Sequence, residues 1–187
     1  VPSSTRVFHD LGFLDKMLAS DFPKKYGAAW TAAAGSQMYE HGWDGLMPQE
    51  HVDIAFRERD QPGVPLKHTW HVDRGRFDAM LLEHAEEAGA RVMQGVPVTR
   101  VHFPEGDHVR VDHTVGGRTA TATARMVVDA SGRRTLLGNQ LKWKIADDVF
   151  DQYALHTWFE DYDRLVVAKE DRFNEYIFIH FLPITNS

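Results

Sequence analysis

The chain has 187 residues, a net charge of −6 at pH 7 and no cysteine. The missing cysteines exclude disulfides, thiolate nucleophiles and Cys-ligated zinc. The acidic balance, with Lys and Arg scattered along the chain, argues against nucleic acid or an anionic membrane as a partner. No stretch reaches the ~18 continuous apolar residues of a membrane span, and the N-terminus lacks a signal-peptide pattern. We therefore expect a cytoplasmic protein of about one domain.

The first third of the chain predicts a helix followed by short strands. Ser3 or Ser4 is a candidate N-cap for a helix with apolar residues at helical spacing over 7–14, ending near Ser20. Beyond it the pattern predicts a loop punctuated by proline and glycine (22–27), two short strands (28–34 and 37–41) and a segment that fits helix or strand equally well (52–56).

The next segment carries a clear helix signal. Asp73 is a good N-cap, and Gly89 stands where a C′ glycine belongs. Between them one helical face is apolar, through Phe77, Met80, Leu81, Ala85 and Ala88. A short strand is expected at 91–93.

Alternating residues then predict an antiparallel meander of three strands, over 98–103, 108–115 and 118–124. The meander leads into residues 126–128, which are apolar on both faces, as in a central parallel strand. A helix at 134–141 and strands at 153–159 and 176–182 complete the pattern, which is mixed α/β. Because an apolar strand lies so close to Ser187, and no initiator Met precedes Val1, we expect both ends to be internal to a longer chain.

The octapeptide VVDASGRR, residues 127–134, is the first candidate site. Ligands of open α/β sheets bind beyond the carboxyl ends of parallel strands. There Asp129 would accept hydrogen bonds from ribityl or ribose hydroxyls, and Gly132 would let the backbone approach a phosphate closely. The alternative is an ordinary strand-to-helix turn in which Asp129 or Ser131 is a cap.

The context of this octapeptide carries a family resemblance. The segment HVDRGRFD, the strand GVPVTRV and VVDASGRR, within about 73–141, resemble the p-hydroxybenzoate hydroxylase-like flavoprotein monooxygenases. The flanking VPSS, FPKKYGA, WFED and FLPITNS resemble the flavin-dependent halogenases. The resemblance implies a partial FAD-binding Rossmann-like domain (about 73–141), with an inserted meander, and substrate-side portions at about 22–72 and 142–187. It also places the missing Gly-rich pyrophosphate loop before Val1.

The same resemblance implies a catalytic lysine. In that family reduced flavin, O2 and halide yield hypohalous acid, and a lysine holds the halogen near an aromatic carbon, through a hydrogen bond or as a haloamine. Lys25 matches that lysine best, because its spacing to Trp30 mirrors the family's spacing, and Lys24 stays the alternative. Without the resemblance, we would interpret both residues as solvent-exposed lysines of a loop.

The resemblance also implies the residues that contact FAD. The Val98 backbone would meet the adenine, and Arg74 or Arg76 would lie near the ribityl phosphate. The contacts at the strand end would be Asp129, Ala130 and Gly132. A surface ion pair of Arg74 with Asp73 or Asp78 is the alternative for that residue. Ser3 and Ser4 would either flank the flavin or cap their helix.

The implied function is FADH2-dependent halogenation, with chlorination favoured, of an electron-rich phenolic or pyrrole-like ring, free or tethered to a carrier protein, in antibiotic biosynthesis. O2, halide and a separate flavin reductase would take part. The alternative is an FAD-dependent monooxygenase or a geranylgeranyl-reductase-like enzyme. We expect the isolated 187 residues to bind FAD weakly and to be inactive. His68, His71 and Asp73 lack a recognised zinc spacing, so no metal site is expected.

Overall fold

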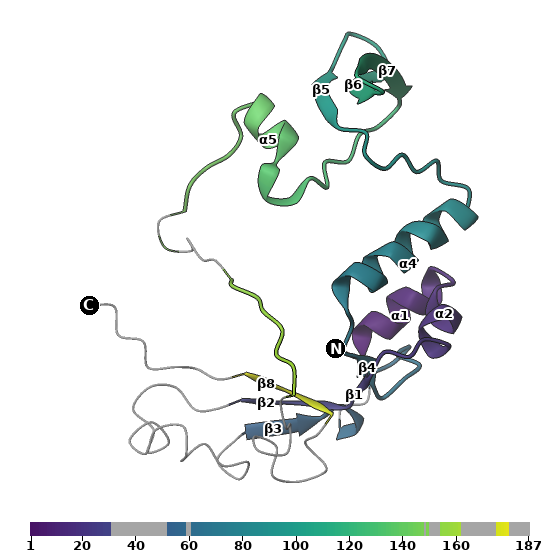
Figure 1. Ribbon diagram of the computed structural model, residues 1–187, viewed down its shortest axis with the longest axis vertical. Helices are drawn as coiled ribbons and strands as arrows, with labels where there is room; N and C mark the ends of the chain where they lie inside the picture. The colour runs from purple at the N-terminus through teal and green to yellow at the C-terminus, as the bar shows by residue number, and fades with distance from the viewer. Residues whose placement is uncertain (31–51, 59–60, 148, 150–153, 162–174, 180–187) are drawn as a thin grey trace. The chain divides into compact units, whose positions relative to one another are not determined.

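A computed structural model of the chain describes residues 1–30, 52–58, 61–147, 149, 154–161 and 175–179 (Figure 1). It divides into two compact units, Val1–Ala90 with Trp158–Ser187, and Arg91–Thr157. The strand expected at 37–41 lies outside the described residues, as do the ends of those expected at 28–34, 153–159 and 176–182. The division into FAD-side and substrate-side portions stays a prediction.

The first unit begins with two helices where the sequence predicted one. These are α1 (Ser3–Asp10) and α2 (Leu14–Leu18), separated at Gly12, whose φ of 69° interrupts the helical path. The N-cap prediction for Ser3 or Ser4 is wrong, because Pro2 holds that position. The Ser4 hydroxyl instead donates a hydrogen bond to the Val1 carbonyl at 2.7 Å.

The helix α4 (Arg74–Glu87) of this unit confirms its sequence signals. The Asp73 carboxylate accepts a hydrogen bond from the Arg76 N–H at 2.8 Å, as an N-cap does. At the other end Gly89 adopts a φ of 96°, the left-handed conformation of a C′ glycine.

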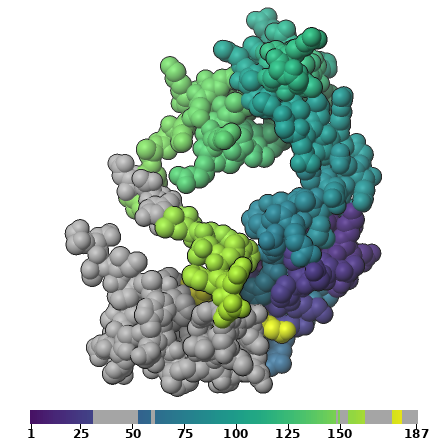
Figure 2. All heavy atoms as spheres, viewed as in Figure 1, coloured from purple at the N-terminus to yellow at the C-terminus, as the bar shows by residue number. Residues whose placement is uncertain are grey.

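An apolar cluster joins α1, α2 and α4. Phe13, Met17, Phe22 and Trp70 are buried at its centre, with Phe77, Met80 and Leu81 of α4 against it. These α4 residues belong to the face predicted from helical spacing. In Figure 2 the purple atoms of α1 and α2 lie directly against the blue-green atoms of α4.

The described residues of the first unit also form two small sheets. In one, β1 (Lys24–Lys25) pairs antiparallel with β4 (Thr69–Trp70). In the other, β2 (Gly27–Trp30) lies between β3 (Val52–Ala55), antiparallel, and β8 (Tyr176–Ile179), parallel. The ambiguous segment at 52–56 is therefore mainly strand, followed by the 3-10 helix η3 (Phe56–Glu58).

The predicted loop at 22–27 is wrong at Lys24 and Lys25, which form a strand. Their partner β4 lies more than forty positions away in the sequence. Local residue preferences could not reveal this pairing, because it depends on a distant segment.

The sheet of β2, β3 and β8 has two different faces, because successive side chains on a strand alternate. On one face Ala29, Ala55 and Tyr176 form a buried cluster with Phe178 packed against it. Side chains of the opposite face line a cavity described below.

The second unit contains the predicted meander. Strands β5 (Val98–His102), β6 (Val109–Val115) and β7 (Arg118–Ala124) pair in that order, antiparallel throughout. Figure 1 shows the three strands next to one another. A bulge interrupts the β5–β6 register between Val98 and Arg100.

Other predictions for this unit, and for the segment 154–159 that continues into the first unit, are wrong. Residues 91–93, 126–128 and 154–159 have no strand structure, and Met126 and Val128 are 77% and 80% exposed. A strand requires a hydrogen-bonding partner, and no described strand pairs with these segments. The single helix expected at 134–141 is a 3-10 turn, η4 (Gly132–Arg134), followed by α5 (Leu136–Gln140).

Replacing Gly27 with alanine tests the close approach of β2 and β8. A Cβ at Gly27 would lie 2.2 Å from Cζ of Tyr176, whose ring is buried. We expect Gly27→Ala to lower the free energy of unfolding by ~1–3 kcal/mol through overpacking, measured by urea denaturation. In a Tyr176→Ala background the same change should cost little. An equal cost in both backgrounds would contradict the contact.

Candidate functional site

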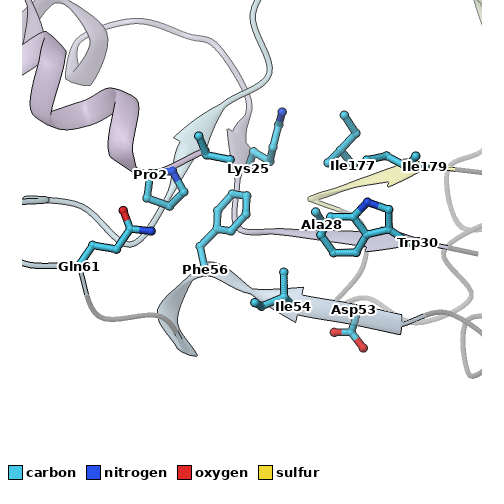
Figure 3. A pocket seen from close by; sticks show the side chains of 11 residues that line it. Pro2, Lys25, Ala28, Trp30, Asp53, Ile54, Phe56, Gln61, Ile177 and Ile179 are labelled. Atoms are coloured by element: carbon cyan, nitrogen blue, oxygen red, sulfur yellow. The ribbon is translucent and has the colours of Figure 1, made fainter. Parts of the chain in front are cut away.

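A cavity of about 680 Å³ opens on the second face of the β2–β3–β8 sheet. Ala28 and Trp30 come from β2, Ile54 from β3, and Ile177 and Ile179 from β8, and their side chains line it together in Figure 3. The other lining residues are Val1, Pro2, Lys25, Asp53, Phe56 and Gln61. All belong to the first unit, and most are apolar. Such a volume and lining are typical of a small-molecule pocket.

Among these lining residues, Lys25 supplies the cationic side chain. It is half-buried, whereas its neighbour Lys24 is exposed and does not line the cavity. The two side chains leave β1 on opposite sides, because residues alternate along a strand. Burial lowers the pKa of His68, and the positive charge of Lys24 lowers it further.

The backbone around Lys25 is held from several directions. Lys25 pairs with Thr69 of β4. One residue later, the Tyr26 N–H donates to the Glu175 carbonyl at 3.1 Å, and the Tyr26 carbonyl accepts from the Phe56 N–H at 2.8 Å. Lys25 therefore lies where the chain passes from one sheet to the next.

Burial lowers the pKa of the Lys25 ammonium below its ordinary value, because desolvation disfavours the charged form. The cavity wall thus raises the neutral fraction of this amine at any given pH. In Figure 3 the Lys25 amine and the Asp53 carboxylate point in opposite directions. Sequence analysis missed Asp53 and Gln61 as lining residues, because neither belongs to a motif.

The turn that contains VVDASGRR is organised by its own acid. Asp129 Oδ1 accepts hydrogen bonds from the Ser131 N–H at 3.0 Å and the Ser131 hydroxyl at 2.5 Å. Its Oδ2 accepts from the Leu137 N–H at 2.7 Å, while Ser131 Oγ accepts from the Leu136 N–H at 2.9 Å. Asp129 and Ser131 therefore satisfy the first two N–H groups of α5, although Thr135 holds its N-cap position and no strand precedes the turn.

These contacts leave room for a ligand. A carboxylate offers about four acceptor positions, and the described contacts of Asp129 use three. The Ser131 hydroxyl, with the Leu137 and Ser131 N–H groups, lowers the pKa of Asp129, so the group is ionised at neutral pH. Ala130 and Gly132 are exposed, and Gly132 has a φ of 61° with open space where a side chain would stand.

Val98 offers its backbone at an open sheet edge. β5 is an outer strand, and the Thr114 N–H donates to the Pro97 carbonyl at 3.0 Å. That bond makes Pro97 and Thr114 a hydrogen-bonded pair. Antiparallel pairs alternate between hydrogen-bonded and non-hydrogen-bonded, so the next pair, Val98 and His113, is non-hydrogen-bonded. The N–H and C=O of Val98 therefore face away from β6.

Arg74 lies in the first unit, whereas Val98, Asp129, Ala130 and Gly132 lie in the second. Its guanidinium donates two hydrogen bonds of 3.1 Å to Asp78 one helical turn later. Asp78 raises the pKa of Arg74 through these bonds. The exposed ion pair expected as the alternative is therefore present, while the Arg74 contact with flavin stays a prediction. Arg76 pairs with Asp21 and lies over the Phe22 ring.

The residues of the second unit fit an FAD ligand in chemistry. The open Val98 backbone presents a donor and an acceptor, which suits the edge of a purine. An ionised carboxylate with spare acceptor capacity suits sugar hydroxyls, and a glycine turn suits a close backbone approach. The buried hydroxyl of Thr135 has no hydrogen-bond partner among the described residues. No metal-binding group of three or more acidic or histidine side chains occurs in the described ranges.

Comparison with known proteins assigns the chain to a family. The sequence profile of the tryptophan halogenase family matches residues 4–157. The chain belongs to this family of enzymes. In the part of the chain that the structure describes, no helix of this family member is both long and apolar enough for a bilayer crossing.

Individual relatives agree with this assignment. A 1H-pyrrole-2-carbonyl-[peptidyl-carrier protein] chlorinase of Pseudomonas fluorescens is 45% identical over the whole chain, which covers 42% of that relative. A tryptophan 2-halogenase of Chondromyces crocatus is 32% identical over 79% of the chain and 25% of its own length. The crystal structure of CmlS, a flavin-dependent halogenase, matches 76% of the chain and 23% of its own, with a TM-score of 0.62 and 25% identity. The chain therefore spans less than half of these relatives and has the mixed α/β fold of a flavin-dependent halogenase.

Titration of Lys25 tests its desolvation. With the lysines 13C-methylated, the Lys25 resonance, assigned by its loss in Lys25→Met, should titrate at lower pH in the folded protein than in urea. A lowered folded pKa means that the folded state binds fewer protons, so the contribution of this group to stability rises with pH up to its unfolded pKa. A folded pKa equal to the unfolded one would contradict desolvation at the cavity.

Removing the Asp129 carboxylate tests the cap on α5. We expect faster amide hydrogen exchange at Leu136 and Leu137 in Asp129→Ala, because their N–H groups bond to Ser131 Oγ and Asp129 Oδ2. The folded pKa is lowered, so the wild-type protection is present above the unfolded pKa and declines as pH falls through the folded value. Unchanged exchange at neutral pH would count against the cap.

Proposed function

We propose that the chain is part of a flavin-dependent halogenase that chlorinates a pyrrole-like ring tethered to a carrier protein. The observation that carries the proposal is the desolvated Lys25 at the wall of an apolar cavity of about 680 Å³. Membership of the tryptophan halogenase family and 45% identity to a pyrrole-2-carbonyl carrier-protein chlorinase support it.

Lys25 acts as the residue that holds the electrophilic halogen beside the ring. As an ammonium it donates a hydrogen bond to the halogen donor, and as a neutral amine it offers a lone pair to the halogen. Its lowered pKa makes the neutral form more accessible. The sheet contacts on both sides of Tyr26 keep the lysine in place during this step.

The cavity suits an aromatic acyl group. Trp30, Phe56 and the isoleucines of β8 supply apolar contact and exclude water from the ring. A single five- or six-membered ring fills only a small part of about 680 Å³. The remaining space would take the tether of a carrier-bound substrate, in agreement with the carrier-protein substrate named for the Pseudomonas relative.

FAD, as FADH2, would be held in part by the Val98 backbone, Asp129, Ala130 and Gly132, with Arg74 near the phosphates. When bound, it supplies with O2 and halide the oxidised halogen that the ring consumes. Asp129 would accept hydrogen bonds from sugar hydroxyls without gaining a proton, because its pKa is already lowered. A separate flavin reductase, in the cytoplasm, would supply the reduced cofactor.

The rest of the site would come from outside this chain, which covers 42% of the Pseudomonas chlorinase. We expect the 187 residues by themselves to bind FAD weakly and to be inactive. Stoichiometric flavin on the purified chain would contradict that expectation.

Substitution of Lys25 tests the catalytic assignment. In the complete protein, supplied with flavin reductase, chloride and a pyrrole-2-carbonyl carrier protein, Lys25→Ala should reduce chlorination at least ~100-fold, as loss of a catalytic side chain does. Oxidation of FADH2 should continue, because the flavin site is untouched. Mass spectrometry of the carrier-bound product and absorbance of the flavin measure the two activities separately.

Lys24→Ala is the matched control, since Lys24 is exposed and is not among the residues that line the cavity. It should chlorinate at close to the wild-type rate. Loss of chlorination in this variant alone would transfer the role to Lys24. A hydroxylated product with no chlorinated one, from the wild-type enzyme, would favour the monooxygenase alternative.

A further inference from the structure

Gln140, the last residue of α5, makes a two-point contact with β5. Its Oε1 accepts a hydrogen bond from the Val101 N–H at 3.0 Å, and its Nε2 donates one to the Val101 carbonyl at 2.6 Å. Val101 is 2% exposed, and these distances are those of full hydrogen bonds. One side-chain amide therefore satisfies both backbone groups of this buried residue.

The contact lies on the same edge of β5 as Val98. Val101 pairs with Val111 in the β5–β6 register, and both of its backbone groups turn away from β6 to reach Gln140. The backbone groups of Val98 also face away from β6. In a regular strand, residues three positions apart direct their backbone groups to opposite edges, but the bulge between Val98 and Arg100 brings both onto the same edge. The edge thus has one position closed by Gln140 and one open at Val98.

The Gln140 amide presents the same pattern as the edge of an adenine. A carboxamide offers an acceptor oxygen beside an amino donor, and adenine offers a ring-nitrogen acceptor beside its amino group. While Gln140 is in place, a purine cannot bind in this way at Val101. The open position at Val98 remains available to it.

The same side chain connects two candidate cofactor segments. The first turn of α5 is bound to Asp129 and Ser131, through the N–H groups of Leu136 and Leu137. Its last residue, Gln140, is bound to β5. α5 therefore acts as a short brace between the 129–132 turn and the strand that carries Val98.

We infer that Gln140 is a positioning residue for the adenine half of FAD: it closes Val101 and sets the spacing between the Val98 edge and the Asp129 turn. This inference rests on the proposed FAD-dependent function. It does not require Gln140 to touch the cofactor.

The test compares two flavins in the complete protein. Gln140→Met keeps the size of the side chain but removes both hydrogen bonds, so FAD should bind about tenfold more weakly, which corresponds to ~1.4 kcal/mol. FMN, which has no adenine, should bind as in wild type. Dissociation constants come from quenching of flavin fluorescence. Deuterium exchange at the Val101 amide, expected to be faster in the variant, reports on the contact without any ligand.

Gln94→Met is the matched control, because Gln94 is exposed in the same unit, and it should change neither affinity. Equal weakening of FAD and FMN by Gln140→Met would overturn the inference, since it would indicate general destabilisation. Unchanged affinity for both flavins would overturn it as well. Failure of the wild-type protein to bind either flavin would instead contradict the proposed function.

Discussion

The position of Lys25 depends on an exchange of hydrogen-bonding partners between two adjacent residues. Lys25 pairs with β4, whereas Tyr26 forms backbone hydrogen bonds with Glu175, just before β8, and Phe56, just after β3. A short strand with one partner would leave a lysine free to move. With partners on three segments, the backbone is fixed on both sides of the residue. The Lys25 side chain therefore starts from a fixed backbone position at the cavity wall, as the halogen-holding role proposed for it would require.

The close packing of β2 on β8 follows from the same arrangement. Gly27 has no side chain, and the Tyr176 ring occupies the space that a Cβ would take. This ring, with Ala29 and Ala55, fills one face of the sheet and leaves the opposite face to form the cavity. The glycine two residues after Lys25 is therefore required by packing at the back of the pocket rather than by contact with a substrate.

In the second unit, a few side chains stabilise the short helix α5. α5 has five residues, too short to be stable alone. Its first two N–H groups, of Leu136 and Leu137, are satisfied by Ser131 and Asp129, and its last side chain is hydrogen-bonded to Val101. The acid proposed to contact a cofactor thus already has a structural function. The two roles are compatible, because a carboxylate has more acceptor positions than this cap uses.

Sequence alone determined the elements whose stability is local. Two elements were predicted correctly: the α4 helix with its Asp73 cap and Gly89 terminus, and the meander with its tight turns. Caps, turns and periodicity depend on residues that are close together in the sequence. The family resemblance of the flanking motifs and the choice of Lys25 as candidate also came from the sequence. Tertiary structure decided what depends on distant partners: the strand at Lys24 and Lys25, the cavity, and the Gln140 contact. An apolar run such as 126–128 is a strand only where another strand supplies its hydrogen bonds, and none of the described strands does so.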